Sequence, residues 1–231
     1  MKSILILAIL LLTLQANDNL AKYGISMKML GEIGHTTLTM KSKDEHYKIV
    51  MHLQMDKSLS DVEHRYESVG TIENGIYKPE HFSKYIREGD HEETNYYIFD
   101  YEQRQIQKYT TIKEDKSMLV SLFSSDEQIV TESFELITDA NFAENDTLST
   151  FLNAKHLLDG RDEMPVTSVG FRKDERNIML HKTEDAYELS IVDKEASDDY
   201  TILVSIAPDG MVKQIFIREY TMLGTISVAR N

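Results

Sequence analysis

The sequence predicts a mainly β protein: a strongly curved antiparallel sheet or an open β-barrel with one or two covering helices. Apolar and polar residues alternate along most of the chain, turn residues separate the alternating segments, and one stretch has helical spacing. A flat sheet of about a dozen strands would expose its edges and one face, so curling is expected. A two-sheet β-sandwich is the alternative.

The N-terminal segment has the pattern of a secretory signal peptide. Lys2 precedes an apolar run, Ile4–Leu12, and Ala16 is a small residue at which a signal peptidase could cleave. The run is about half of the ~20 residues that a membrane-spanning helix needs. We therefore expect residues 1–16 to be a signal peptide and residues 17–231 to form a single antiparallel β domain. The expected location is the periplasm; secretion or anchoring by an uncleaved segment are alternatives.

Charge and cysteine content exclude several classes of function. The formal net charge is −14, and removal of Lys2 leaves 24 basic against 39 acidic residues, a net charge of −15. A protein that binds nucleic acid needs a basic stripe to neutralise phosphates, and the sequence has none. The chain has no cysteine, so disulfides, thiol catalysis, Cys-ligated metals and a lipid-modified N-terminal cysteine are excluded.

The N-terminal half is predicted to form an antiparallel meander, because its apolar residues recur with a period of two. The predicted strands are Lys22–Leu30, Glu32–Lys41, His46–Asp56, Val62–Glu73, Ser83–Glu88, Asn95–Tyr101 and Gln105–Ile112. Turn residues separate them, among them Asn74-Gly75 and Lys78-Pro79. The segment Asp126–Thr138 combines helical apolar spacing with β-branched residues, and the pattern assigns it to neither class.

The C-terminal half is predicted to contain one helix followed by further strands. The helix spans Asp146–Gly160, with Asp146 as its N-cap and Gly160 as its stop. The strands are Asn177–Lys182, Tyr187–Asp193, Tyr200–Ala207, Met211–Tyr220 and Met222–Arg230. Pro208-Asp209-Gly210 has the composition of a hairpin turn.

No catalytic motif is present in the sequence. A Gly-x-Ser-x-Gly elbow, a phosphate-binding glycine loop and the HExxH zinc motif are all lacking. Ser149 falls in the first turn of the predicted helix, where capping explains it better than nucleophilic catalysis. We therefore expect no catalytic residue, cofactor or metal ligand, and a hydrolase with an unrecognised carboxylate or histidine site is an alternative.

Methionine is concentrated on the apolar face of two early strands. Met27, Met29, Met51 and Met55 all lie there, in a chain with eleven methionines and no tryptophan. Because methionine adapts to irregular shapes, this face is a candidate surface for an apolar ligand. An ordinary hydrophobic core is the alternative interpretation.

Several short motifs resemble a known family. An opening strand contains Tyr23-Gly24-Ile25. The later motif residues are Gly75, Pro79 and Phe82, then Phe99 and Asp100, then Asp146, Leu148 and Ser149. This order resembles the exported bacterial family called domain of unknown function 3108. The resemblance implies a periplasmic or envelope location and a predominantly antiparallel β fold, and it implies no catalytic residues.

These observations favour a non-enzymatic periplasmic binding or carrier module. The expected ligand is apolar, such as lipid or a lipoprotein-like cargo, shielded by the curved sheet. The alternative is an interaction module in envelope assembly, which needs an exposed apolar patch or a free sheet edge. A partner is expected to be lipid or an envelope protein, with no nucleic acid and no stable membrane span after signal cleavage.

Overall fold

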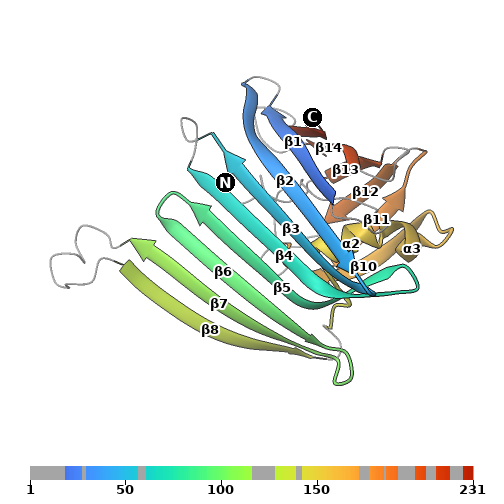
Figure 1. Cartoon of the computed structure of the whole chain (residues 1–231), viewed down its shortest axis with the longest axis horizontal. Helices are drawn as coiled ribbons and strands as arrows, with labels where there is room; N and C mark the ends of the chain where they lie inside the picture. The colour runs from blue at the N-terminus through green and yellow to red at the C-terminus, as the bar shows by residue number, and fades with distance from the viewer. Residues whose placement is uncertain are drawn as a thin grey trace.

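One continuous curved sheet organises the chain (Figure 1). The computed structural model describes residues 19–27, 30–56, 61–115, 128–138, 142–171, 177–184, 186–191, 201–206, 212–218 and 226–230. Within them, fifteen strands pair in the order β8-β7-β6-β5-β4-β3-β2-β1-β15-β14-β13-β12-β11-β10-β9. The sheet is open, because β8 and β9 stand at its two ends. The predicted class, a curved antiparallel sheet with covering helices, is confirmed.

The first eight strands form a meander in which each strand pairs with the next one along the chain. Their bounds are β1 Asn19–Met27, β2 Gly31–Lys43, β3 His46–Met55, β4 Val62–Glu73, β5 Ile76–Glu88, β6 His91–Asp100, β7 Gln105–Asp115 and β8 Gln128–Thr138. Two-residue turns join β2 to β3 and β4 to β5, and the predicted Asn74-Gly75 turn is confirmed with φ of 54° and 80°. Positive φ at both positions matches the twist of the flanking strands.

The C-terminal part curls back behind the first strands and encloses two short helices (Figure 1). Its elements are β9 Asn145–Asp146, α2 Thr147–Leu152, α3 Ala154–Leu158, β10 Glu163–Val169, β11 Asn177–Lys182, β12 Ala186–Ile191, β13 Thr201–Ile206, β14 Val212–Arg218 and β15 Ile226–Arg230. All neighbouring strands pair antiparallel except β9 with β10. The predicted turn at residues 208–210 and the predicted signal peptide at residues 1–16 lie outside the described residues.

The prediction of a turn at Lys78-Pro79 is wrong, because β5 begins at Ile76 and runs through Pro79. The pairing with β4 shifts there: Gly70 faces Pro79 and Val69 faces His81, so Glu80 is an extra residue on β5. Proline has no N–H to donate and is tolerated in a strand at such a bulge. Gly70 permits the close approach, since a Cβ on it would lie 1.9 Å from the Lys78 carbonyl oxygen.

The unassigned segment Asp126–Thr138 contains strand β8. Val130 and Phe134 are four residues apart, which places them on one face of a helix but also on one face of a strand. The segment is a strand because it pairs with all eleven residues of β7. Ile137, the third residue of the helical spacing, points to the opposite face and is buried against Ile106.

The predicted helix at Asp146–Gly160 is divided into two. Asp146 is the N-cap, as predicted, and the helical backbone is interrupted at Asn153. The second helix ends at Leu158, and its C-cap Asp159 is left-handed with φ 38°, followed by Gly160 with φ 80°. Among the described residues, no helix has both the length and the apolar composition needed to cross a membrane.

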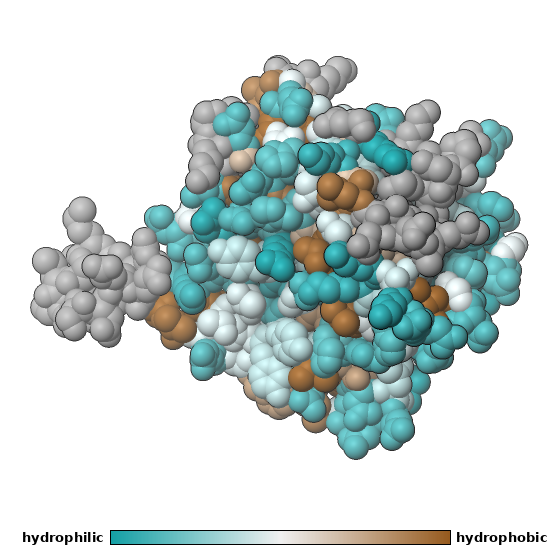
Figure 2. Space-filling model, viewed as in Figure 1, coloured by the Kyte–Doolittle hydropathy of each residue, from teal (hydrophilic) through white to brown (hydrophobic). Residues whose placement is uncertain are grey.

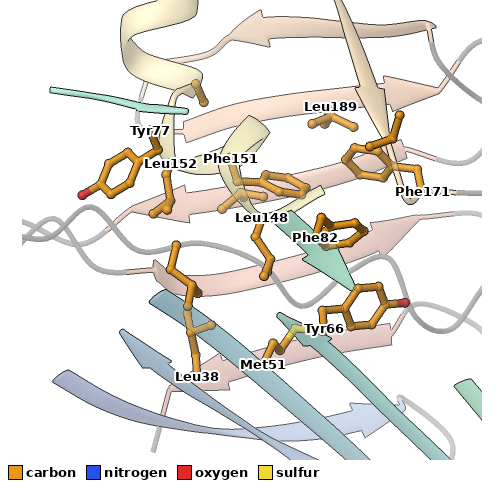
Figure 3. Packing of buried hydrophobic residues seen from close by; sticks show 14 of the residues in the cluster. Leu38, Met51, Tyr66, Tyr77, Phe82, Leu148, Phe151, Leu152, Phe171 and Leu189 are labelled. Carbon is orange, nitrogen blue, oxygen red and sulfur yellow. The ribbon is translucent and has the colours of Figure 1, made fainter. Parts of the chain in front are cut away.

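The inner face of the curved sheet and the two helices form the hydrophobic core. Leu148, Phe151 and Leu152 of α2 pack among inward side chains of the sheet (Figure 3). The outer face of β1–β8 is largely hydrophilic (Figure 2). It carries cross-strand ion pairs such as Lys48 with Glu67 and Arg87 with Glu63. Inward apolar and outward charged residues therefore account for the alternation in the sequence.

Candidate functional site

Four features could carry function: the motif residues around α2, the methionine face, a cluster of buried polar residues and the exposed edge of the sheet. Three of the motif residues, Asp146, Leu148 and Ser149, form the capped start of helix α2. The Asp146 carboxylate accepts hydrogen bonds from the backbone N–H groups of Leu148 (2.7 Å) and Ser149 (2.8 Å). The Ser149 hydroxyl in turn accepts a bond from the Asp146 N–H, which completes a capping box. The predicted capping role of Ser149 is confirmed.

Asp146 also ties the helix to the first half of the sheet. Ser68 of β4 donates a hydrogen bond to Asp146 Oδ2 at 2.5 Å, and the Tyr47 hydroxyl of β3 lies 3.1 Å from Ser68 Oγ. All three side chains are buried. Burial raises the pKa of the Asp146 carboxyl to about 6, although the hydrogen bonds from Ser68, Ser149 and Leu148 act in the opposite direction. The carboxyl is therefore a structural anchor without contact to solvent.

Asn153 performs the same task between α2 and β5. Its Oδ1 accepts a bond from the Tyr77 N–H and its Nδ2 donates to the Tyr77 carbonyl, both at 2.8 Å. Nδ2 also donates to Asn145 Oδ1 at 2.8 Å. The side chain thus replaces a neighbouring strand for one residue of β5. These bonds hold the junction of α2 and α3 against β5.

The other motif residues make packing contacts or local hydrogen bonds. Phe82 is fully buried under Gly170, whose φ is 90° and whose Cβ, if present, would lie 2.2 Å from the Phe82 ring. Pro79 accepts a hydrogen bond at its carbonyl from the Tyr101 hydroxyl, and Phe99 stacks on the Tyr101 ring. Gly75 packs against His156 of α3, and Asp100 accepts a bond from Gln103 N–H in the β6–β7 turn. The contacts of the motif residues therefore indicate a role in stabilising the fold.

The methionine face lies mostly in the core. Met27 and Met51 are buried, and Met55 is half-buried at the rim, where it lines a pocket of about 480 Å³ with Val62 and Arg87. Met29 lies outside the described residues. Met51 has no exposed surface, because the surrounding side chains cover it. Binding of an apolar ligand at this face stays a prediction.

Three residues of β4 and β5, His64, Tyr66 and Glu88, have buried polar side-chain atoms that form no hydrogen bond within the described part of the chain. Among the described residues, the two ring nitrogens of His64 and the Tyr66 hydroxyl have no hydrogen-bond partner. Glu88 Oε1 lies 3.5 Å from His64 Nε2. Burial lowers the pKa of His64 and raises that of Tyr66. His64 is sealed from solvent, so this cluster offers no accessible binding site.

The described residues contain no group of three or more His, Asp or Glu side chains placed to hold a metal ion.

The exposed end of the sheet is the strongest candidate for an interaction surface. β7 pairs with one edge of β8, and no described strand pairs with its other edge. Every described side chain of β8 except Ile137 is exposed. Four of them are large and apolar, between 43% and 58% exposed: Ile129, Val130, Phe134 and Leu136. We call these four the β8 apolar residues. The opposite end, β9, is two residues long and buried.

The apolar surface continues from β8 onto its neighbours. In the outer-face register, Phe134 lies opposite Tyr109, which lies opposite Tyr96, and both tyrosines are exposed. The Tyr109 and Phe134 ring centroids are 5.1 Å apart. Figure 2 shows apolar surface along the left and lower margin, where Figure 1 places β7 and β8. The apolar residues of β8 are visible in the sequence, but they indicate an interaction surface only once β8 is known to be an edge strand.

Comparisons with known proteins agree with the fold and give no activity. A family profile described as "Protein of unknown function (DUF3108)" matches residues 21–229. No curated protein is significantly similar to the chain. One similar solved structure is a beta-barrel-like protein of domain of unknown function DUF1849 from Brucella abortus, with a TM-score of 0.50 and 7% identity. The match covers 94% of this chain and 97% of that one, and it shows a shared fold.

Proposed function

Because the chain belongs to the DUF3108 family of proteins of unknown function, we propose its role from its own surface: it is a non-enzymatic module that binds a protein strand at β8. The partner segment is extended, with apolar residues at alternate positions. The signal-like N-terminal segment supports an exported, periplasmic setting, in which the module serves envelope assembly.

The edge of β8, which no described strand covers, is the observation that carries this proposal. An edge strand presents unpaired N–H and C=O groups, and natural proteins usually protect it with charge, proline, shortness or a covering element. β8 has eleven residues, no proline and no lysine or arginine. Its two glutamates are outnumbered by the β8 apolar residues. Such an edge matches the mode in which an added strand gives affinity through its backbone and specificity through alternate side chains.

A carrier of lipid or lipoprotein-like cargo, the other function that the sequence suggests, has weaker support. That role needs an apolar face open to the cargo. Met27 and Met51 pack against the chain's own side chains, and α2 occupies the inner face beside β4 and β5. Among the described residues, six of the nine exposed large hydrophobic side chains instead lie on β6, β7 and β8.

A generic strand-forming peptide tests the proposal, because pairing through the backbone does not depend on the exact sequence of the partner. We would titrate a fluorescent peptide of alternating valine and threonine, with lysine at both ends, against dilute protein and follow its anisotropy. The double variant Val130→Lys, Leu136→Lys should bind about tenfold more weakly or worse, because charge on an edge strand disfavours pairing. Ile76→Lys is the matched control, since Ile76 is 41% exposed and lies at the start of β5. Equal binding by all three proteins, or no binding to any, would contradict the proposal.

A further inference from the structure

We propose that the strand bound at β8 is β8 of a second copy of this chain, so that two sheets join edge to edge. This inference rests on the proposed function of the edge. A two-fold dimer brings the same segment of both subunits together, which requires that the segment complement itself when its direction is reversed. β8 meets this requirement in one antiparallel register, centred on Ser133.

In that register the whole strand pairs: Gln128 of each subunit lies opposite Thr138 of the other. Residues facing each other must point to the same side of the joined sheet, which restricts the allowed registers to steps of two along one strand. On the outer side, Val130 meets Leu136. On the inner side, Ile129 meets Ile137. Both apolar pairs occur twice because of the two-fold symmetry, and such cross-strand pairs stabilise a sheet.

The charges of β8 are compatible with this register and disfavour one of the two neighbouring registers. Glu132 lies opposite Phe134 and Glu135 lies opposite Thr131, so no two carboxylates face each other. Within its own subunit, Glu135 is already paired with Lys108 at 3.3 Å. A shift of one step places Glu132 opposite Glu132, and like charges directly opposite are destabilising. The opposite shift separates Val130 from Leu136 and Ile129 from Ile137.

The outer aromatic pair adds a further element at the junction. Phe134 is 58% exposed in the single chain, and its ring lies tilted against that of Tyr109. In the centred register its cross-strand neighbour is Glu132 and its diagonal neighbours are Val130 and Phe134 of the partner subunit. Diagonal positions are within reach of aromatic side chains. The two Phe134 rings therefore meet across the two-fold axis and extend the Tyr96–Tyr109–Phe134 row.

Cysteine cross-linking tests the register directly, because the chain has no cysteine of its own. In the proposed dimer Ser133 faces Ser133, and directly opposite strand residues lie within the range that a disulfide spans. Ser133→Cys should therefore give a covalent dimer under mild oxidation. Thr131→Cys alone and Glu135→Cys alone should not, whereas an equal mixture of these two should give the heterodimer.

Sedimentation of the purified full chain supplies the second measurement. The unmodified protein should dimerise reversibly, and Leu136→Lys should raise the dimer dissociation constant at least about tenfold, with Ile76→Lys unchanged. A monomer at all concentrations, or a dimer in which Ser133→Cys does not cross-link, would overturn the inference. In either case binding of the valine–threonine peptide, lost in the β8 variants, would leave the proposed function standing with a different partner.

Discussion

Asp146 is the residue at which the most separate parts of the fold meet. Its backbone belongs to the short strand β9, its carboxylate caps α2, and the same carboxylate receives the Ser68 hydroxyl from β4. A buried charge is costly unless hydrogen bonds compensate for it. Here burial outweighs the hydrogen bonds and raises the pKa to about 6, so the proton is retained at mildly acidic pH. The site therefore links one residue to the stability of the whole fold.

Replacing Asp146 by Asn should remove part of the pH dependence of folding. The folded-state pKa of about 6 lies above the unfolded value of 3.8, so the native state binds more protons between these values. The stabilisation is present below about pH 4 and is lost as pH rises through 6, by about 3 kcal/mol at most. Urea unfolding from pH 4 to 7 should show this loss in the wild-type protein and not in Asp146→Asn.

Asp100→Asn is the control for this measurement, because Asp100 is half-exposed and bonds only locally in the β6–β7 turn. It should follow the wild-type profile. An unchanged pH profile in Asp146→Asn would show that the carboxyl does not titrate in this window.

At the level of elements, the attachment of α2 to β5 depends on one side chain. Asn153→Ala removes the bonds to the Tyr77 N–H and carbonyl and leaves both groups buried without that partner. We expect a loss of about 3 kcal/mol in the free energy of unfolding. His156→Ala, at an exposed position of α3, should change it by less than about 0.5 kcal/mol. Chemical unfolding followed by circular dichroism measures both, and equal effects would refute the role of Asn153.

The elements that the sequence predicts well are those with unambiguous local patterns. Alternation along β3 and β4 and the capping residues of α2 are local signals, and the structure confirms them. The start of β5 is not predicted, because Pro79 is typical of a break and only pairing with Gly70 makes a bulge there possible. The pattern leaves β8 unassigned because a spacing of four residues fits both a helix and a strand.

The candidate site could not be predicted because it depends on contacts between distant residues. Ser68 and Asp146 are separated by 78 positions, and neither position carries a signal for the other. The role of the β8 apolar residues follows from the strand order, which places β8 at an end of the sheet. Alternation predicts which residues share a face, but it does not predict which strand is the last one.

On the scale of the whole molecule, the sheet is long and open, and its two ends differ. One end, β9, is short and buried beside α2, whereas β8 is long and exposed. The molecule also carries a net charge of −14, which disfavours association of two copies at long range. Pairing at β8 must therefore come from short-range contacts of backbone and apolar side chains.

Salt should consequently strengthen the dimer. Raising the ionic strength from about 0.05 M to about 0.5 M shortens the Debye length from roughly 14 Å to roughly 4 Å and screens the repulsion between the two acidic chains. The dissociation constant measured by sedimentation equilibrium should fall several-fold. A dissociation constant that rises with salt would instead show that attraction between opposite charges holds the subunits together.

Hydrogen exchange across β7 and β8 tests the availability of the edge most directly. Among the described strands, β7 has a partner on both sides, whereas β8 has a partner on one side only. If β8 binds an extended strand, the β8 amides that point away from β7, called the outward amides, should exchange more slowly as the protein concentration rises. The same slowing is expected when the valine–threonine peptide is added to dilute protein. The β7 amides should not change. Fast exchange of the outward β8 amides under all of these conditions would contradict the account.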